Sequence, residues 1–165
     1  YLDWIGLDEN LTKLDELART NGIRATDSLQ LFEIPKVNNG KYTTYFFSHG
    51  ISHLPKSYLD RIEEIQEGER LYLMQDIQNK VDKLALMLRT DDPVELMGYC
   101  PRVYTKDINR LLEANNNEVR VTVKKVNQTA PLQLKLLYQL EAQWPEGFKS
   151  FHDDEFMPFN LSVES

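Results

Sequence analysis

Residues 70–88 read RLYLMQDIQNKVDKLALML, and this stretch carries the strongest signal for the fold. Two apolar runs, Arg70–Gln75 and Leu84–Leu88, have the composition of β-strands. The polar segment between them holds two carboxylates, two amides and two lysines, namely Asp76, Gln78, Asn79, Lys80, Asp82 and Lys83. The segment is either a plain hairpin connection or a binding loop whose side chains are held in place by two rigid strands.

The overall composition is that of a globular domain. The chain has 165 residues, of which 41% are hydrophobic and 27% are charged, and this length is enough to bury a core. Its single cysteine, Cys100, excludes an internal disulfide and fits a reducing compartment, so we expect a cytoplasmic protein. We expect no membrane span, because no apolar run approaches roughly 20 residues. Since the chain starts at Tyr1 with acidic residues close behind, we expect the C-terminal part of a longer protein.

The charge distribution bears on nucleic-acid binding. The formal net charge is −7, which argues against non-specific binding to duplex DNA but leaves room for a small site that takes a strand end. The stretch from Arg102 to Lys125 is locally positive, with six basic residues against three acidic ones. This stretch is either a contact for phosphates or the solvated edge of a helix and a strand.

Periodicity divides the rest of the chain into short elements. We expect an amphipathic helix on Leu11, Leu14, Leu17 and Ala18, then a strand over Ser28–Ile34, a turn at 38–40 and a strand over Tyr42–Ser48. A helix capped by Ser57 follows, with Leu59, Ile62 and Ile65 directed inward. After a turn at 91–93, we expect a strand over Val94–Cys100 and a helix capped by Thr105. Val119, Val121 and Val123 alternate with polar residues and predict a half-buried strand. A similar alternation predicts the next strand at Leu132, Leu134 and Leu136, and the tail Trp144–Phe159 is expected to be extended and packed on the body.

These elements predict a mainly β protein, with α+β character overall. Several short strands interrupted by two short helices are typical of a small, partly open β-barrel or curled sheet. The N-terminal amphipathic helix precedes this barrel. We expect two units, an extension over residues 1–40 and a barrel domain with an extended C-terminal tail over residues 41–165.

Five motifs in order resemble the HIRAN domain family. They are Phe46–Ile51, Gly68–Leu73, the pattern Asp76-x-x-Asn79-x-x-Asp82-x-x-Ala85-Leu86, Gly98–Arg102, and a helix followed by Val119–Val126. The resemblance covers about residues 43–140, and the flanking segments look like those of bacterial proteins that carry this domain near the C-terminus. It implies an OB-like barrel that is not itself an enzyme and that holds the 3′ end of single-stranded DNA.

The resemblance also implies roles for individual residues. Asp82 matches the carboxylate that accepts a hydrogen bond from the terminal 3′-hydroxyl, Asn79 matches a loop asparagine, and Gln78 stands where a second asparagine is common. Arg102 is placed to meet a phosphate. Tyr99 belongs to an apolar strand, and its ring is expected either in the core or at the border of the site.

This chain departs from the family pattern around the expected stacking surface. Val81 replaces a loop aromatic and Lys80 replaces a loop proline. Ser52, His53 and Leu54 stand where the DNA-binding relatives have a basic residue and aromatics, although His53 has the chemistry to stack on a base or meet a phosphate. A protein-interaction module with a degenerate nucleic-acid groove is therefore the alternative function.

Two catalytic interpretations have weaker support. A metal-dependent hydrolase would need its ligands from His49, His53, His152, Asp153 and Asp154, but Gly50 and Pro55 argue against a helix that pairs the first two histidines. A nucleophilic dyad would need Cys100 as an exposed thiolate, whereas a position at a strand end favours a packed thiol. We therefore expect no cofactor and no metal site.

Overall fold

The computed structural model describes residues 34–115 and 118–152, apart from the side chain of His53. Its elements follow the chain as β1 (Lys41–Phe47), the 3-10 turn η1 (Ile51–His53), α2 (Ser57–Glu64), β2 (Arg70–Gln75), β3 (Leu86–Arg89), β4 (Leu96–Tyr99), α3 (Arg102–Ala114), β5 (Arg120–Val126), the 3-10 turn η2 (Leu132–Leu134) and β6 (Leu136–Gln143). The predicted N-terminal helix, most of the strand expected at 28–34 and the tail beyond residue 152 lie outside the described residues. Within the described part, no helix has the length and apolar character needed to cross a bilayer.

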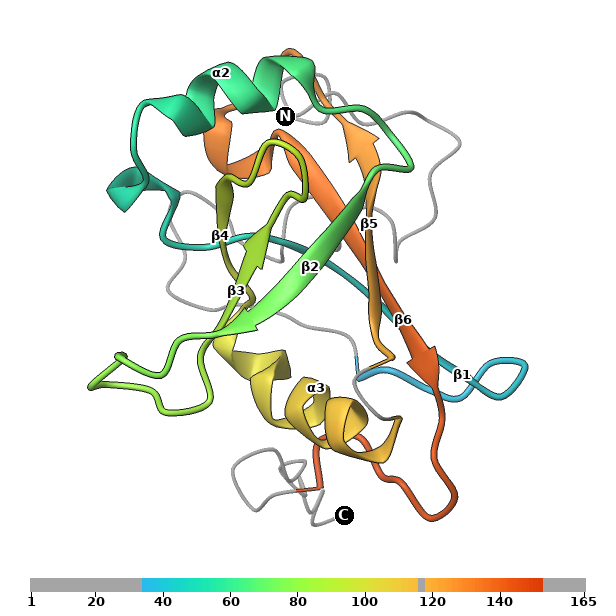
Figure 1. Ribbon diagram of the computed structural model, residues 1–165. Helices are drawn as coiled ribbons and strands as arrows, with labels where there is room; N and C mark the ends of the chain where they lie inside the picture. The colour runs from blue at the N-terminus through green and yellow to red at the C-terminus, as the bar shows by residue number, and fades with distance from the viewer. Residues whose placement is uncertain (1–33, 116–117, 153–165) are drawn as a thin grey trace, which may run out of the picture.

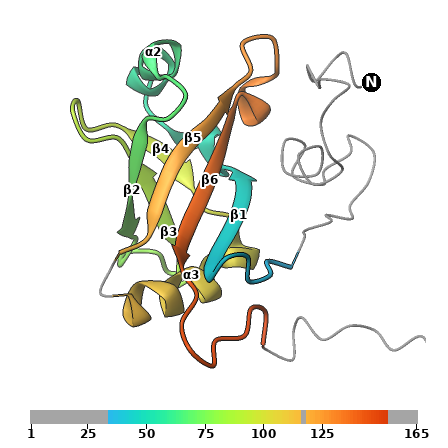
Figure 2. The same cartoon turned by 90° about the vertical axis from the view of Figure 1, so that its right-hand side faces the viewer.

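The six strands form one antiparallel sheet that curls on itself (Figures 1 and 2). The strand order is β1-β6-β5-β2-β3-β4, so β1 and β4 are the edges. The edges meet just after β1, where His49 and Tyr99 exchange two backbone N–H···O bonds of 2.8 and 2.9 Å. Helices α2 and α3 lie at opposite ends of the curled sheet (Figure 1). The prediction of a mainly β, partly open barrel with two helices is confirmed.

Gly98 allows the two edges to meet. Its φ is +104°, a backbone conformation that residues other than glycine rarely adopt. A Cβ at this position would lie 2.8 Å from the carbonyl oxygen of His49 and 2.9 Å from the Cβ of Ser48. Any larger residue would therefore push β4 away from the segment that follows β1.

The hydrophobic core fills the inside of the curled sheet. Strand β5 shows how alternation builds it, because Val121 and Val123 are buried whereas Arg120 and Lys124 are exposed, as predicted. The largest fully buried side chains come from both helices and from the strands of the sheet. They include Tyr42, Phe46, Ile62, Leu71, Leu88, Met97, Ile108, Leu111, Tyr138 and Leu140.

The position predicted for the last strand was wrong. Leu132–Leu134 form η2, which opens after Pro131 with a bond of 2.9 Å from the Leu134 N–H to the Pro131 carbonyl. The strand is Leu136–Gln143, and it pairs with β1 on one side and β5 on the other. Its first three residues are all buried. A strand that is paired on both sides within a curled sheet lacks the regular alternation of buried and exposed residues on which the prediction relied.

Both predicted helix caps were also wrong. Ser57 is the first residue of α2, and its hydroxyl donates to Glu95 Oε1 at 2.8 Å instead of capping the helix. Helix α3 begins at Arg102, after Pro101, and the Thr105 hydroxyl donates to the Arg102 carbonyl at 2.9 Å. Each hydroxyl finds its acceptor through the structure that surrounds it, which local spacing does not reveal.

The buried face of α2 and the starts of two strands differ from the predictions. Leu59 is 44% exposed and Tyr58, which is 2% exposed, takes its place in the core. Strand β3 starts at Leu86 because the backbone N–H of Leu84 donates to Asp82 Oδ1 and so belongs to the loop. Strand β4 starts at Leu96 rather than at Val94, which is 63% exposed.

The segment after β6 packs back on the body, as predicted for the part that the structure describes. The Trp144 ring lies 5.9 Å from the ring of Tyr42, centroid to centroid. Asp107, buried on α3, accepts hydrogen bonds from the Tyr42 hydroxyl at 3.3 Å, from the Ser150 hydroxyl and from the Phe151 N–H at 3.2 Å. This carboxylate therefore ties the C-terminal segment to both α3 and β1.

Candidate functional site

The β2–β3 loop, residues 76–85, is ordered by its own side chains. Asn79 Oδ1 accepts from the backbone N–H groups of Val81 at 3.0 Å and Asp82 at 2.9 Å. Asp76 accepts from the Gln78 N–H through Oδ1 at 3.2 Å and from the Asn79 N–H through its carbonyl at 3.2 Å. Such local bonds from Asx side chains hold a loop in a defined conformation, so the connection between β2 and β3 is ordered.

Asp82 has one carboxylate oxygen engaged and one open. Oδ1 accepts from the Leu84 N–H at 2.9 Å, and the Asp82 carbonyl accepts from the Ala85 N–H at 3.3 Å. Among the residues that the structure describes, Oδ2 has no hydrogen-bond partner. The side chain is half-buried, so its open oxygen is held in a fixed direction and can accept from a hydroxyl or an amine.

Both sides of the loop are tied to the body of the domain. At its base, the Asp76 N–H donates to the Ala85 carbonyl at 3.0 Å. The side-chain amide of Asn109, on α3, donates to the Leu84 carbonyl at 3.1 Å. The Tyr99 hydroxyl, at the end of β4, donates to Asp76 Oδ2 at 2.7 Å. The loop therefore projects beyond the sheet beside the start of α3 on a rigid base (Figure 1).

Tyr99 connects this loop to the segment after β1. A Cβ on Gly50, whose φ is +70°, would lie 3.1 Å from Tyr99 Cδ2, so the ring packs closely on the Gly50 backbone. The hydrogen bond to Asp76, together with burial, raises the pKa of Tyr99 and keeps its hydroxyl protonated. Burial lowers the pKa of His49, which favours its neutral imidazole.

The structure brings some of the predicted site residues together and leaves others apart. Gln78, Asn79 and Asp82 share the loop, and Tyr99 joins them through Asp76, which the sequence analysis did not select. Asp76 and its tyrosine are 23 positions apart, and no local pattern links them. Arg102 is exposed at the start of α3 and makes no hydrogen bond or ion pair with the loop in the described part of the chain. His53 lies in η1, and its side chain is outside the described residues.

The tip of the loop exposes apolar side chains. Ile77 is 85% exposed and Val81 is 87% exposed. Val81 stands where an aromatic ring was expected from the resemblance, so the loop offers a base or a protein partner an aliphatic surface of modest area.

Neither catalytic interpretation gains support from the geometry. No group of three or more metal-ligating side chains occurs among residues 34–115 and 118–152, and Asp153 and Asp154 of the predicted metal set lie outside them. Cys100 is buried, and burial raises the pKa of its thiol far above the ordinary value. This cysteine is therefore a packed thiol, and the prediction of a core role holds.

Comparison with protein families decides the relationship. The model of the HIRAN domain matches residues 41–141, a range that starts at the first residue of β1 and ends within β6. This chain belongs to the HIRAN domain family. The resemblance inferred from the five motifs is confirmed. HIRAN domains are nucleic-acid-binding modules, and the β2–β3 loop lies within the matched range.

Solved structures that resemble this HIRAN domain include two at low sequence identity. One is the crystal structure of a protein from Lactobacillus plantarum, with 15% identity and a TM-score of 0.48, covering 62% of this chain and 97% of that one. Another is the HIRAN domain of human HLTF, with 12% identity and a TM-score of 0.41, covering 62% of this chain and 72% of that one. Comparison with curated proteins gave no match.

Proposed function

We propose that this HIRAN domain holds the 3′ end of single-stranded DNA without catalysing a reaction on it, and that Asp82 accepts the hydrogen bond of the terminal hydroxyl. The observation that carries the proposal is that the two carboxylate oxygens of Asp82 differ in their hydrogen bonding. One fixes the loop through the Leu84 N–H, and the other has no partner in the described part of the chain. A carboxylate accepts from a free hydroxyl and repels a 3′-phosphate, so it selects the chemistry of the end.

The remaining predicted residues have supporting roles in this proposal. Gln78 presents an exposed amide beside Asp82, and Asn79 sets the direction of the Asp82 backbone. Arg102 and His53 supply contacts for phosphates from α3 and η1. Stacking of a base on an aromatic ring is worth roughly 1–3 kcal/mol, and Val81 forfeits part of that term. We therefore expect weak binding by this domain alone, which would act as the end-binding part of a longer cytoplasmic protein with residues 1–40 as an extension.

A second candidate is a protein-interaction module, favoured by the exposed aliphatic tip of the loop. Ile77 and Val81 together would fit a shallow apolar pocket on a partner, and a rigid loop presents them at little entropic cost. In this case binding would depend on the two side chains and would be insensitive to Asp82.

Fluorescence anisotropy with short single-stranded DNA tests the proposal. The assay compares a free 3′-hydroxyl with a 3′-phosphate at low salt, where phosphate contacts are strongest. Asp82→Asn keeps one oxygen acceptor for the Leu84 N–H and replaces the other oxygen with an NH2 group, which removes both the charge and the open acceptor. We therefore expect the fold to survive and the hydroxyl preference, about tenfold in the natural chain, to be lost. Asp60→Asn makes the same charge change on the exposed side of α2, at the other end of the barrel, and should leave the preference intact.

Two results would count against end recognition. Equal affinity for both ends in the natural chain would show that the carboxylate does not read the terminal group. Absence of binding at low salt, combined with capture of a protein partner that is lost in a Val81→Ser variant, would favour the interaction module.

A further inference from the structure

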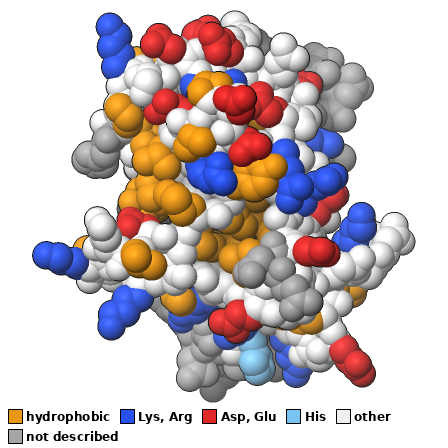
Figure 3. All heavy atoms as spheres, in the orientation of Figure 1, with side chains coloured by type: hydrophobic (Ala, Val, Ile, Leu, Met, Phe, Trp, Pro, Cys, Tyr) orange, Lys and Arg blue, Asp and Glu red, His pale blue; other side chains and the backbone are white. Residues whose placement is uncertain are grey.

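The outer surface of β2, β3 and β4 carries aromatic, thioether and basic side chains. Strand alternation directs Tyr72 and Met74 outward on β2 and Met87 and Arg89 outward on β3, because their neighbours in sequence are buried or turned inward. Tyr72 stands opposite Arg89, Met74 opposite Met87, and Met87 opposite Tyr99 on β4. Figure 3 shows hydrophobic side chains gathered over these strands, with basic side chains among them.

Two arginines flank one tyrosine on this surface. The guanidinium carbons of Arg70 and Arg89 each lie 5.0 Å from the centroid of the Tyr72 ring. Arg89 also donates to the Thr90 carbonyl at 3.0 Å, and its ion pair with Asp91, at 3.6 Å, is exposed and therefore weak. Arg70 has no ion pair with any described residue. The two like charges are thus held in place by the ring, without a carboxylate that neutralises both.

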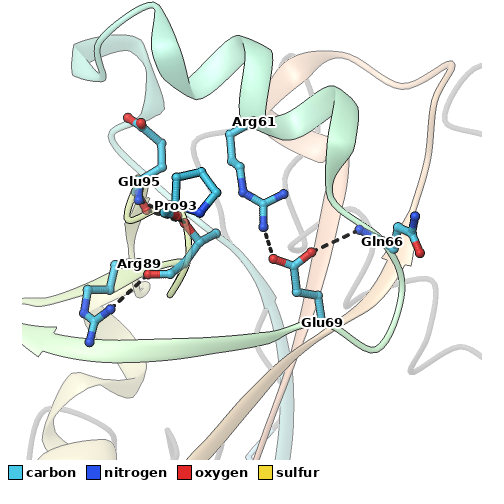
Figure 4. Close-up of polar contacts among 7 residues, drawn as sticks. Arg61, Gln66, Glu69, Arg89, Pro93 and Glu95 are labelled. Carbon is cyan, nitrogen blue, oxygen red and sulfur yellow. Dashed lines mark hydrogen bonds and ion pairs between the residues drawn. The ribbon is translucent and has the colours of Figure 1, made fainter.

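Of the carboxylates close to this surface in sequence, Asp91 pairs with Arg89 itself, and three others have partners elsewhere. Glu69, next to Arg70, pairs with the buried Arg61 of α2 (Figure 4). Glu95 accepts from the Ser57 hydroxyl, and Asp76 accepts from a tyrosine hydroxyl and a backbone N–H. Among the described residues, Asp91 therefore offsets the charge of Arg89 only, and the charge of Arg70, held over the Tyr72 ring, has no carboxylate partner.

Strand β5 extends the positive surface on the far side of Arg70. Arg70 stands opposite Thr122, and Arg120 and Lys124 alternate with the buried valines of β5, so they point to the same outer side. These residues are part of the positive stretch noted in the sequence. The structure separates Arg120 and Lys124 from Arg102, which starts α3, and places their strand next to β2, which carries Arg70.

We infer that the Arg70–Tyr72–Arg89 surface is a second contact for the single strand, on the 5′ side of the nucleotide held at the β2–β3 loop. This inference rests on the proposed function and deepens it. Tyr99, which borders the loop, is paired across the sheet with Met87, and Met87 with Met74, so these three residues form one row across the strands. Tyr72 and Arg89 form the next row, two residues further along β2 and β3. Strand spacings place the two rows so that Tyr72 is roughly 12 Å from Tyr99.

The separation of the two contacts matches a short run of nucleotides. At roughly 3.4 Å per nucleotide, a stacked strand covers that distance in about four nucleotides. Arg70 and Arg89 then bind phosphates, and the bases lie over the thioether side chains of Met74 and Met87. The flat guanidinium groups, braced by the Tyr72 ring, suit phosphate contacts without regard to base sequence.

The test compares a trinucleotide with a dodecanucleotide, both with a free 3′-hydroxyl, by anisotropy across a salt series. In the Arg70→Gln/Arg89→Gln double variant we expect the dodecamer affinity to fall about tenfold and its salt slope to drop by roughly 1.4, while the trinucleotide is unaffected. The Arg70→Lys/Arg89→Lys variant keeps both charges and should retain most of the slope. Lys41→Gln removes an exposed charge at the start of β1 and serves as the control.

The outcomes separate this inference from the proposed function. If the double glutamine variant leaves the dodecamer unchanged, or weakens both oligonucleotides equally, the second contact is wrong even when the hydroxyl preference of the trinucleotide stands. If Asp82→Asn has no effect on either oligonucleotide and the dodecamer still depends on the arginines, end recognition fails and the surface remains. If poly-glutamate displaces the dodecamer as well as unlabelled dodecamer does, the surface recognises charge alone and the inference is overturned.

Discussion

Removal of the Asp107 carboxylate should leave the buried Tyr42 hydroxyl without a hydrogen-bond acceptor and detach the C-terminal segment from α3. Asp107 is buried on α3 and accepts from Tyr42, Ser150 and the Phe151 N–H. Tyr42 is completely buried, and burial, followed by the negative charge of Asp107, raises the pKa of its phenol, so it stays a donor at all accessible pH values. In Asp107→Ala, Ser150 and Phe151 can turn to water because they belong to a half-buried segment, whereas the Tyr42 hydroxyl cannot.

The magnitude follows from these three donors. A hydrogen bond to a charged group contributes about 1.5–3 kcal/mol, and a stranded buried hydroxyl costs about 1–3 kcal/mol. Relief from burying the carboxylate offsets part of this loss, so we expect Asp107→Ala to lower the free energy of unfolding by about 3 kcal/mol. With a urea m-value of about 2 kcal/mol per molar, the midpoint should shift by about 1.5 M.

Urea unfolding followed by tryptophan fluorescence measures this shift. A Trp4→Phe background leaves Trp144, whose ring packs on Tyr42, as the one reporter. Tyr42→Phe alone should cost about 1 kcal/mol, and in the Asp107→Ala background it should cost nothing or stabilise, because it removes the stranded hydroxyl. A loss below about 1 kcal/mol for Asp107→Ala, or an equal cost of Tyr42→Phe in both backgrounds, would refute the reasoning.

Two further predictions concern the closure of the barrel. Gly98→Ala places a Cβ 2.8 Å from the His49 carbonyl and should destabilise the fold by about 2–4 kcal/mol in chemical denaturation, whereas Gly147→Ala, with a φ of +72° and nothing within 4 Å, should cost only about 1–2 kcal/mol; equal losses would show that the close approach is not the cause. Burial lowers the folded-state pKa of His49, so its contribution to stability is fully present above the ordinary histidine pKa of about 6.5 and is lost as the pH falls below it. His49→Gln should flatten the pH dependence of the unfolding free energy below about 6.5, and an unchanged profile would contradict this assignment.

Local patterns were enough to predict the elements whose environment repeats along the chain. Strand β2 has the predicted bounds, β1 differs by one residue at each end, and the valines of β5 alternate as expected. The order of the five motifs was enough to indicate the HIRAN family, because each motif is a local run of residues. Local patterns failed at β6, which is paired on both sides and buried on consecutive residues, and at Ser57 and Thr105, whose hydroxyls bond to groups other than the expected cap.

The candidate site shows the same division. Asn79 and Asp82 were selected because the loop resembles the HIRAN pattern. That resemblance does not show that one Asp82 oxygen accepts from the Leu84 N–H, which only the folded loop reveals. The Tyr99–Asp76 bond joins positions 23 apart, and it escaped prediction because it depends on β4 lying beside β3.

The amino-acid sequence by itself determined the mainly β character, the loop and the family, since burial periodicity, turn residues and motif order are properties of neighbouring residues. Only the tertiary structure decided which distant side chains meet, because that depends on strand order and register. Asp107 accepts hydrogen bonds from a tyrosine 65 positions away and a serine 43 positions away. Gly98 is required because the segment after β1 passes close to it, and Arg89 reaches Tyr72 because β2 and β3 pair in one register. A shift of one residue in that register would turn Tyr72 or Arg89 to the other face of the sheet and separate them.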